Sequence, residues 1–231
     1  MTKFRKWLGV ELVEVSLTEK LIAAAGGGLA IFTLMALTFW ALPAVGAMAV
    51  LASMGASAVL LFGVPHGQLS QPWPVIAGHV VSAAIGVACA RYISQPEIAT
   101  ACAVGLAIGA MHQFKCIHPP GGATAFTAVM GDSAIHDLGF KFVLFPVLTN
   151  AIAMVLLAVL INSAFKWRRY PVGFSIAPRP TRPAFSEEVP PPTHEEVVAA
   201  IKSLDSFVDI SEEDLLRLIK ILSRTRQSDH A

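Results

Sequence analysis

Long uninterrupted apolar runs, rather than alternating apolar and polar positions, dominate the first two thirds of the chain. Residues 21–90 contain no formally charged side chain, and residues 91–165 contain six: Arg91, Glu97, Lys115, Asp132, Asp137 and Lys141. A charge at the centre of a bilayer costs at least about 2.5 kcal/mol, so a membrane-embedded stretch excludes charges. Charged residues make up 14% of the chain, against roughly 25% in soluble domains. The pattern predicts an integral membrane protein.

Five apolar runs approach the length of about 20 residues that a helix needs to cross a bilayer. They cover residues 21–41, 44–64, 75–93, 98–113 and 142–165. The uncharged connector PHGQLSQPWP separates the second run from the third. A sixth run, residues 121–131, is only about half as long as a typical span.

The basic residues outside these runs predict how the chain is oriented. Lys3, Arg5 and Lys6 precede the first run, and Lys166, Arg168 and Arg169 follow the last. Because basic residues favour the cytoplasmic side, we expect both termini in the cytoplasm and an even number of crossings. Counting residues 121–131 as a segment predicts six. Four or five segments plus a re-entrant loop is the alternative.

A weak internal repeat favours six segments. GASAVLLFG, from Gly55, resembles GATAFTAVMG, from Gly122, and the two start 67 residues apart. Each lies in the middle of a possible three-helix unit, residues 21–93 and 98–165. Inverted repeats with broken helices are a recurrent transporter design. We therefore expect an all-α, polytopic transmembrane helix bundle of two inverted three-helix repeats. Small-residue bias could also produce both motifs by chance.

The two ends of the chain differ from this transmembrane domain, residues 21–170. Residues 1–20 are basic and amphipathic, which suits an interfacial helix. Residues 171–192 form a proline-rich linker. Residues 193–231 predict a cytoplasmic helical hairpin, because capping pairs precede two helical patterns. The apolar stripe of the second, Leu215, Leu218, Ile219 and Leu222, should pack on a partner or a second copy of this chain. We expect a homo-oligomer.

The stretch KCIHPPGGATAF, residues 115–126, places helix-breaking residues between two apolar runs. Pro119 and Pro120 lack a backbone N–H and disfavour helix in the residue before them. The preceding helix should therefore end before His118, and a new helix should begin near Pro120. Irregular backbone at membrane depth requires a protein or water environment.

The start of that new helix predicts a site for a small anion. Its first free N–H groups, those of Gly121, Gly122 and Ala123, are expected to bind a negative charge. Thr124 adds a hydroxyl, and Lys115 and His118 add positive charge. The alternative is a turn at the membrane surface, with Lys115 reaching the headgroups.

HPPGGATAF is similar to the signature of the HPP family of integral membrane proteins, which is named after that tripeptide. The resemblance extends to GASAVLLFGVPHGQLSQPWPVIAGH and NSAFKWRRYP and covers roughly residues 20–171. Members in chloroplasts and cyanobacteria are implicated in nitrite transport. The resemblance therefore implies a transporter or channel for a small monovalent oxyanion, above all nitrite, in the inner cell membrane. Larger relatives continue into a pair of CBS domains, so this chain resembles a short form.

By the same resemblance, the candidate substrate site comprises seven consecutive residues: His118, Pro119, Pro120, Gly121, Gly122, Ala123 and Thr124. The repeat adds Gly55, Ala56 and Ser57. Further candidates are His79 and Ser82, one turn apart in the third span, and Asn150 in the last. An intramembrane histidine suggests function, although His79 and Asn150 could each also simply bond a neighbouring helix.

Other functions find little support in the residues. His112, Cys116 and His118 are poorly spaced for a metal, and no catalytic set or phosphate-binding loop occurs, so we expect neither an enzyme nor a cofactor. Three cysteines form no disulfide framework, and a net charge of +1 does not suggest nucleic acid. His118 and His79 suit proton carriers if protons are coupled, because imidazole titrates near neutral pH. The alternative function is a membrane sensor or scaffold acting through the helical tail.

Overall fold

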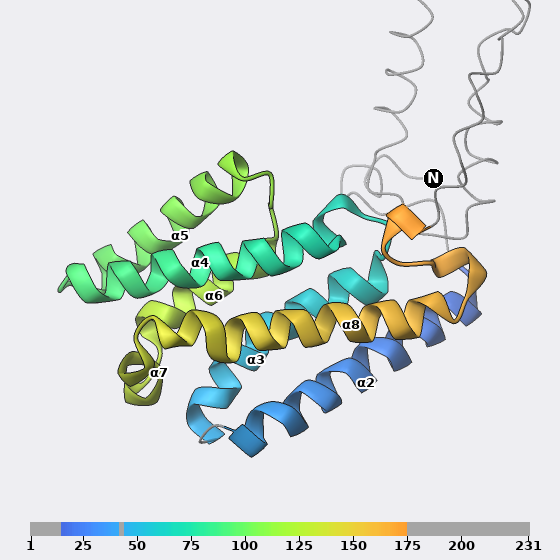
Figure 1. Cartoon of the computed structure of the whole chain (residues 1–231), viewed down its shortest axis with the longest axis horizontal. Coiled ribbons are helices and arrows are strands. Elements are labelled where there is room, and N and C mark those ends of the chain that lie inside the picture. Colours follow the sequence, from blue (N-terminus) through green and yellow to red (C-terminus); the bar gives the residue numbers. More distant parts are fainter. Residues whose placement is uncertain (1–14, 42–43, 175–231) are drawn as a thin grey trace, which may run out of the picture. The chain divides into compact units, whose positions relative to one another are not determined.

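The computed structural model describes residues 15–41 and 44–174, and every regular element in these ranges is helical. The longer helices are α2 (Leu17–Ala41), α3 (Ala44–Ala58), α4 (Pro72–Tyr92), α5 (Pro96–Gln113), α6 (Pro119–Met130) and α8 (Thr149–Ser163). The shorter ones are η1 (Val59–Gly63), η2 (Gln68–Ser70), α7 (Ser133–Leu138), η3 (Val143–Leu148), η4 (Lys166–Arg168) and η5 (Val172–Phe174). Figure 1 shows them along the chain. Most of the predicted interfacial segment and linker, and all of the predicted tail hairpin, lie outside the described residues.

Three helical stretches are long and apolar enough to cross a membrane: Leu17–Trp40, Pro72–Tyr92 and Val143–Ser163. Val50–Gly63 is a shorter apolar helix. Large apolar side chains on these stretches, such as Phe32, Trp40 and Leu160, are exposed. Exposed apolar surface of this extent suits contact with lipid chains. The structure is that of an integral membrane protein.

The expected helix boundaries hold for most segments. The second apolar run is one continuous helical stretch, because α3 passes directly into the π-helix η1. The third helix begins at Pro72 rather than Val75, since proline is well suited to a first helical turn. The last run is interrupted, because Phe145 has non-helical φ −137° and ψ 122° before Pro146. The short helix α7 was not predicted.

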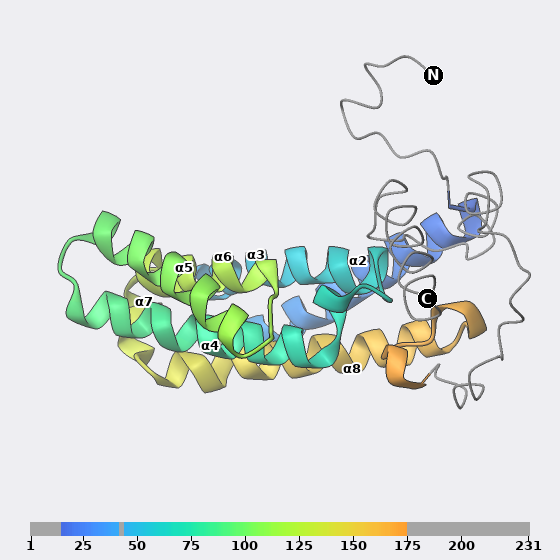
Figure 2. The same cartoon turned by 90° about the horizontal axis from the view of Figure 1, so that it is seen from above.

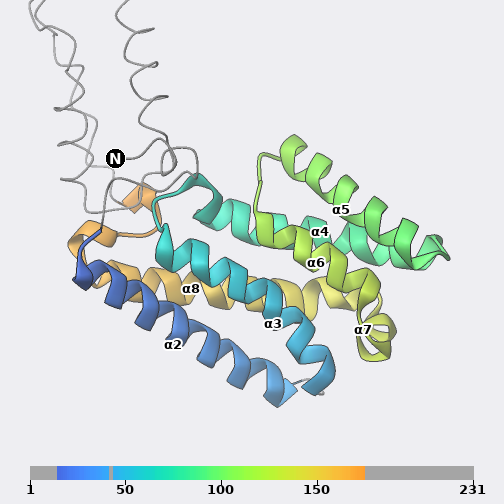
Figure 3. The same ribbon diagram turned by 180° about the vertical axis from the view of Figure 1, so that it is seen from behind.

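Helix α6 packs against α3, α4 and α5, and Figure 3 shows it between α3 and α4. Its contact with α4 is made by small residues. A Cβ atom on Gly86 would lie 2.7 Å from the Ala125 carbonyl oxygen, and one on Gly121 would lie 2.9 Å from the Gly78 carbonyl oxygen. Glycine lets the two backbones approach this closely, as in other membrane helix pairs.

The break before α6 lies inside the bundle. A Cβ atom on Gly78 of α4 would lie 2.7 Å from Cβ of His118. Helix α4 begins at Pro72, and with a rise of 1.5 Å per residue Gly78 lies about 9 Å along the helix from that start. The 12 residues of α6 extend about 18 Å, less than the hydrocarbon thickness of about 30 Å. The segment therefore starts partway along α4. The count of six segments and the inverted repeat remain predictions.

The unit Leu21–Ser175 begins and ends at one end of the bundle. A Cβ atom on Gly26 of α2 would lie 2.8 Å from the Phe62 ring and 3.2 Å from Ile161 of α8. The N-terminal part of α2 therefore lies beside the C-terminal part of α8. Helix α8 also packs along α4, as Figure 2 shows. The number of crossings stays a prediction.

Candidate functional site

The chain breaks and restarts where the sequence predicted. Helix α5 ends at Gln113, Lys115 adopts a left-handed φ of 54°, and the extended His118 precedes a helix that begins at Pro119. The start is one residue from the expected Pro120. His118 itself is fully buried, with 0% of its surface exposed.

A network of four side chains lies at this restart, three of them on helices α3, α4 and α6 and the fourth, His118, directly before α6. The Oγ atom of Ser57 is 2.8 Å from Nε2 of His79 and 2.9 Å from Nε2 of His118. The other ring nitrogen of His79, Nδ1, is 2.7 Å from the Thr124 hydroxyl. Each of the four side chains is at most 1% exposed. The sequence named all four as candidates, and the structure brings them into direct contact.

Backbone carbonyls terminate the network on both sides. Nδ1 of His118 lies 2.8 Å from the Leu69 carbonyl oxygen, and the Thr124 hydroxyl lies 3.4 Å from the Pro120 carbonyl oxygen. The two imidazole rings meet edge to face, with centroids 4.9 Å apart. Leu69 was not predicted, because a carbonyl contribution depends on the path of the connector and not on a side-chain type.

The two repeat motifs contribute equivalent residues to this network. Ser57 and Thr124 occupy the same position in GAS and GAT, and they contact opposite nitrogens of the one His79 ring. The first positions also match, because a Cβ atom on either Gly55 or Gly122 would meet nothing within 4 Å. Ala56 and Ala123 are both exposed.

The expectation that backbone N–H groups of α6 are free for an anion is wrong for Gly121. Its N–H donates to the His118 carbonyl at 2.8 Å, and Pro119 and Pro120 have no N–H to offer. From Ala123 onward, the regular helical pattern directs each N–H to the carbonyl four residues earlier. Polar side chains are therefore the main groups that can bind a ligand here.

The other predicted residues lie outside the four-residue network. Pro120 and Gly121 are buried, whereas Pro119 and Lys115 are exposed. Ser82 donates to the Met111 sulfur at 3.8 Å. Asn150 accepts a hydrogen bond from Thr38 of α2 at 3.2 Å, and its buried Nδ2 has no partner in the described part of the chain. Among the described residues, no three His, Cys, Asp or Glu side chains converge to hold a metal ion.

A second polar cluster, which the sequence did not reveal, anchors the end of α8. The buried Arg168 donates to the Phe62 carbonyl at 2.6 Å and to Oδ1 of Asn162 at 3.1 Å. The Tyr170 hydroxyl donates to the Ser70 carbonyl at 2.8 Å. Ser70 follows Leu69 directly, so the cluster also holds the connector that contacts His118. An arginine after the last span suggests a surface charge, and only the fold shows it to be buried.

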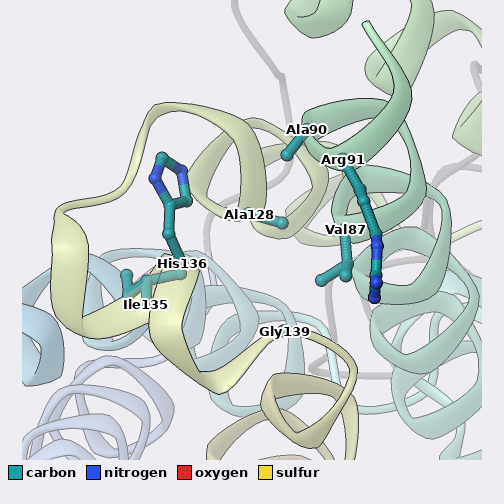
Figure 4. Close-up of a pocket in the computed structure, with 7 residues that line it drawn as sticks. All are labelled: Val87, Ala90, Arg91, Ala128, Ile135, His136 and Gly139. Carbon is teal, nitrogen blue, oxygen red and sulfur yellow. The ribbon is translucent and has the colours of Figure 1, made fainter.

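A cavity of about 320 Å³ lies elsewhere, at the far end of α4. Figure 4 shows Arg91 and His136 at its edge, with Val87, Ala128 and Ile135 among the apolar residues that line it. His136 already bonds the Val129 carbonyl at 3.0 Å through Nε2. None of the predicted site residues lines this cavity.

The family model described as HPP, transmembrane region, matches residues 13–171. The chain belongs to this family. The match spans the helical unit and includes all four residues of the network, Ser57, His79, His118 and Thr124.

Two transmembrane proteins of Dictyostelium discoideum are similar to this HPP chain. One is 44% identical over 126 residues, 53% of this chain and 40% of the relative. The other is 42% identical over 124 residues, 52% of this chain and 43% of the relative. The matches thus span less than half the length of either relative. No solved structure matches the chain.

Proposed function

We propose that this HPP protein moves a small monovalent oxyanion, nitrite before others, across the membrane through a site built around Ser57, His79, His118 and Thr124. One observation carries the proposal. Two histidines and two hydroxyls are fully buried together in a domain whose outer surface suits lipid. Polar groups inside a membrane are costly and are typical of substrate pathways.

The chemistry of the network suits an anion of this kind. Hydroxyl and imidazole N–H groups donate hydrogen bonds to oxyanions, and no carboxylate is among the four side chains. The positive end of the α6 dipole lies at the same place.

Access requires the network to open, because its side chains contact one another and are almost fully buried. Ser57 belongs to α3 and Thr124 to α6, so a relative movement of these two helices would separate the hydroxyls from the His79 ring. Movement of one repeat against the other is how inverted-repeat transporters alternate access. We infer the same movement here.

The test is nitrite uptake into proteoliposomes that contain the purified full chain. Wild type should take up nitrite faster than protein-free vesicles, with competition by nitrate, chloride and bicarbonate defining selectivity. His118→Ala should reduce uptake to the protein-free level, because it removes the ring that bonds both Ser57 and the Leu69 carbonyl. Gly122→Leu should do the same, because it places a bulky side chain on α6 two residues from Thr124. Gly105→Leu on α5 is the matched control, since Gly105 also has open space around it but lies outside the network.

Circular dichroism and gel filtration should show that all variants remain folded. Wild-type uptake no faster than that of protein-free vesicles would contradict transport of nitrite. Capture of a protein partner without any flux would instead favour a sensor or scaffold. Unchanged flux in both site variants would contradict the assignment of the site.

A further inference from the structure

The hydrogen-bond partners of His118 determine which of its nitrogens carries a proton. The Leu69 carbonyl can only accept, so Nδ1 of His118, 2.8 Å away, must be the donor. In a neutral ring Nε2 then has no hydrogen and must accept. Its partner at 2.9 Å is the Ser57 hydroxyl. That hydroxyl also lies 3.3 Å from the Ser53 carbonyl oxygen, but the bare nitrogen is the closer acceptor, so Ser57 donates its one hydrogen to His118.

The same reasoning extends to His79 and Thr124. Since the Ser57 hydrogen points to His118, the contact of 2.8 Å to His79 requires Nε2 of His79 to donate. A neutral His79 ring then has a bare Nδ1, which must accept from the Thr124 hydroxyl at 2.7 Å. The neutral network therefore has one polarity, running from Thr124 through His79, Ser57 and His118 to Leu69.

This polarity makes the Thr124 hydroxyl unavailable to a ligand as long as both rings are neutral. A hydroxyl has one hydrogen to donate, and His79 takes it. If a proton binds to Nδ1 of His79, that nitrogen becomes a donor and the Thr124 hydrogen is released. Its remaining acceptor, the Pro120 carbonyl, is 3.4 Å away, which is a long hydrogen bond. The released hydroxyl can then donate to an anion.

We propose that the site takes up its anion together with one proton, which binds to Nδ1 of His79 and releases the Thr124 hydroxyl for the anion. This coupling rests on the proposed transport function. The charges also favour it, because a buried cation or anion alone is costly whereas the pair is neutral. Among the described residues, the titratable group that faces each imidazole ring is the other imidazole, and the two ring centroids are 4.9 Å apart. Because two cations at this distance would repel each other, the pair of rings takes up only one added proton.

Ser57 lets the added charge pass between the rings without ring movement. Nε2 of His79 gives its proton to the Ser57 oxygen, and the Ser57 hydroxyl gives its own hydrogen to Nε2 of His118. Two protons move, no atom is gained or lost, and the positive charge passes from His79 to His118. The cation then lies at the connector side of the network, where Leu69 accepts from it.

The first test measures protonation and needs no transport. Solid-state ¹⁵N NMR of the full chain in lipid bilayers, with His79→Asn and His118→Asn used for assignment, reports which ring nitrogens carry hydrogen. Neutral His118 with hydrogen on Nδ1 and neutral His79 with hydrogen on Nε2 would support the polarity. Any other pattern at neutral pH would overturn it.

The second test separates coupling from transport. Nitrite uptake is driven either by an inward proton gradient at zero potential or by an inside-positive potential at equal pH, with protein-free vesicles as the blank because nitrous acid itself crosses bilayers. Electroneutral proton–nitrite symport should respond to the proton gradient and not to the potential. Uptake driven only by the potential would overturn the coupling but keep the transport function. Uptake at the protein-free level under both conditions would overturn both.

Two variants assign the coupling to named hydroxyls. Ser57→Ala and Thr124→Val, the latter nearly isosteric, should each lower gradient-driven uptake at least about tenfold, the value of a lost hydrogen bond. Ser53→Ala is the matched control one turn earlier on α3. In the described part of the chain the Ser53 hydroxyl bonds the Val50 carbonyl at 2.8 Å and no member of the network, and the substitution keeps the Ser53 carbonyl that lies 3.3 Å from Ser57. Uptake within about twofold of wild type in both test variants would overturn the relay. If neither variant folds, the wild-type NMR pattern still decides the question.

Discussion

Arg168 holds the end of η1, and Tyr170 holds the connector between η1 and α4. Arg168 bonds the Phe62 carbonyl and Tyr170 the Ser70 carbonyl. Burial raises the pKa of the Tyr170 hydroxyl, so this group stays protonated and remains a donor. Because Leu69 precedes Ser70, these bonds also hold the carbonyl that accepts from His118. The position of the imidazole thus depends on residues beyond the last span.

Replacing Tyr170 with phenylalanine should destabilise the protein while keeping its shape. The change removes the donor to a buried Ser70 carbonyl, which costs about 1–3 kcal/mol. For a chain of this size each kcal/mol lowers the midpoint of thermal unfolding by roughly 2–4 °C. Tyr92→Phe is the matched control, since Tyr92 is 78% exposed. Fluorescence-monitored melting in detergent checks both, and equal midpoints would contradict the role of the bond.

At the scale of elements, the contact of α4 with α6 sets the geometry of the site, because α4 carries His79 and α6 carries Thr124. Gly86→Ala should destabilise this contact by about 1–3 kcal/mol through overpacking, since the new Cβ would lie 2.7 Å from both the Ala125 carbonyl and the Ala128 Cβ. Gly105→Ala on α5 meets nothing within 4 Å and should be neutral or slightly stabilising. Thermal unfolding in detergent compares the two, and equal destabilisation would contradict the packing.

The restart of α6 could be predicted from sequence because prolines act locally on the backbone. The same holds for the apolar runs, whose length reflects the bilayer. The interruption at Phe145 has the same local cause, since Phe145 precedes Pro146, and it was missed. The short helix α7 was missed as well. The four site side chains were named individually, but their mutual contacts depend on the close approach of α4 and α6. The error over free N–H groups came from overlooking that Gly121 can bond His118 locally.

At the scale of the whole helical unit, the two ends differ in charge. One end contains the connector 64–71 and the segment after α8, which Tyr170 joins to Ser70. Near it lies the end of α5, where Trp73 bonds the Phe114 carbonyl. The charged residues of the unit Leu21–Ser175 at this end are Lys115, Lys166, Arg168 and Arg169, and the first turn of α2 adds Glu19 and Lys20. The loops at the other end carry both signs: Arg91, Glu97, Asp132, Asp137 and Lys141.

The positive-inside rule then predicts that the connector end faces the cytoplasm. In a background with Cys89, Cys102 and Cys116 replaced, Gln68→Cys should react with a membrane-impermeant maleimide only from the cytoplasmic side. Ser94→Cys, between α4 and α5, should react only from the outside, because α4 is long enough to separate the two loops. Both positions are exposed, so a lack of reaction from one side reports the membrane and not burial. Labelling intact cells and inverted vesicles in parallel measures this. Reaction of both cysteines from the same side would mean that α4 does not cross, and exchanged sides would reverse the orientation.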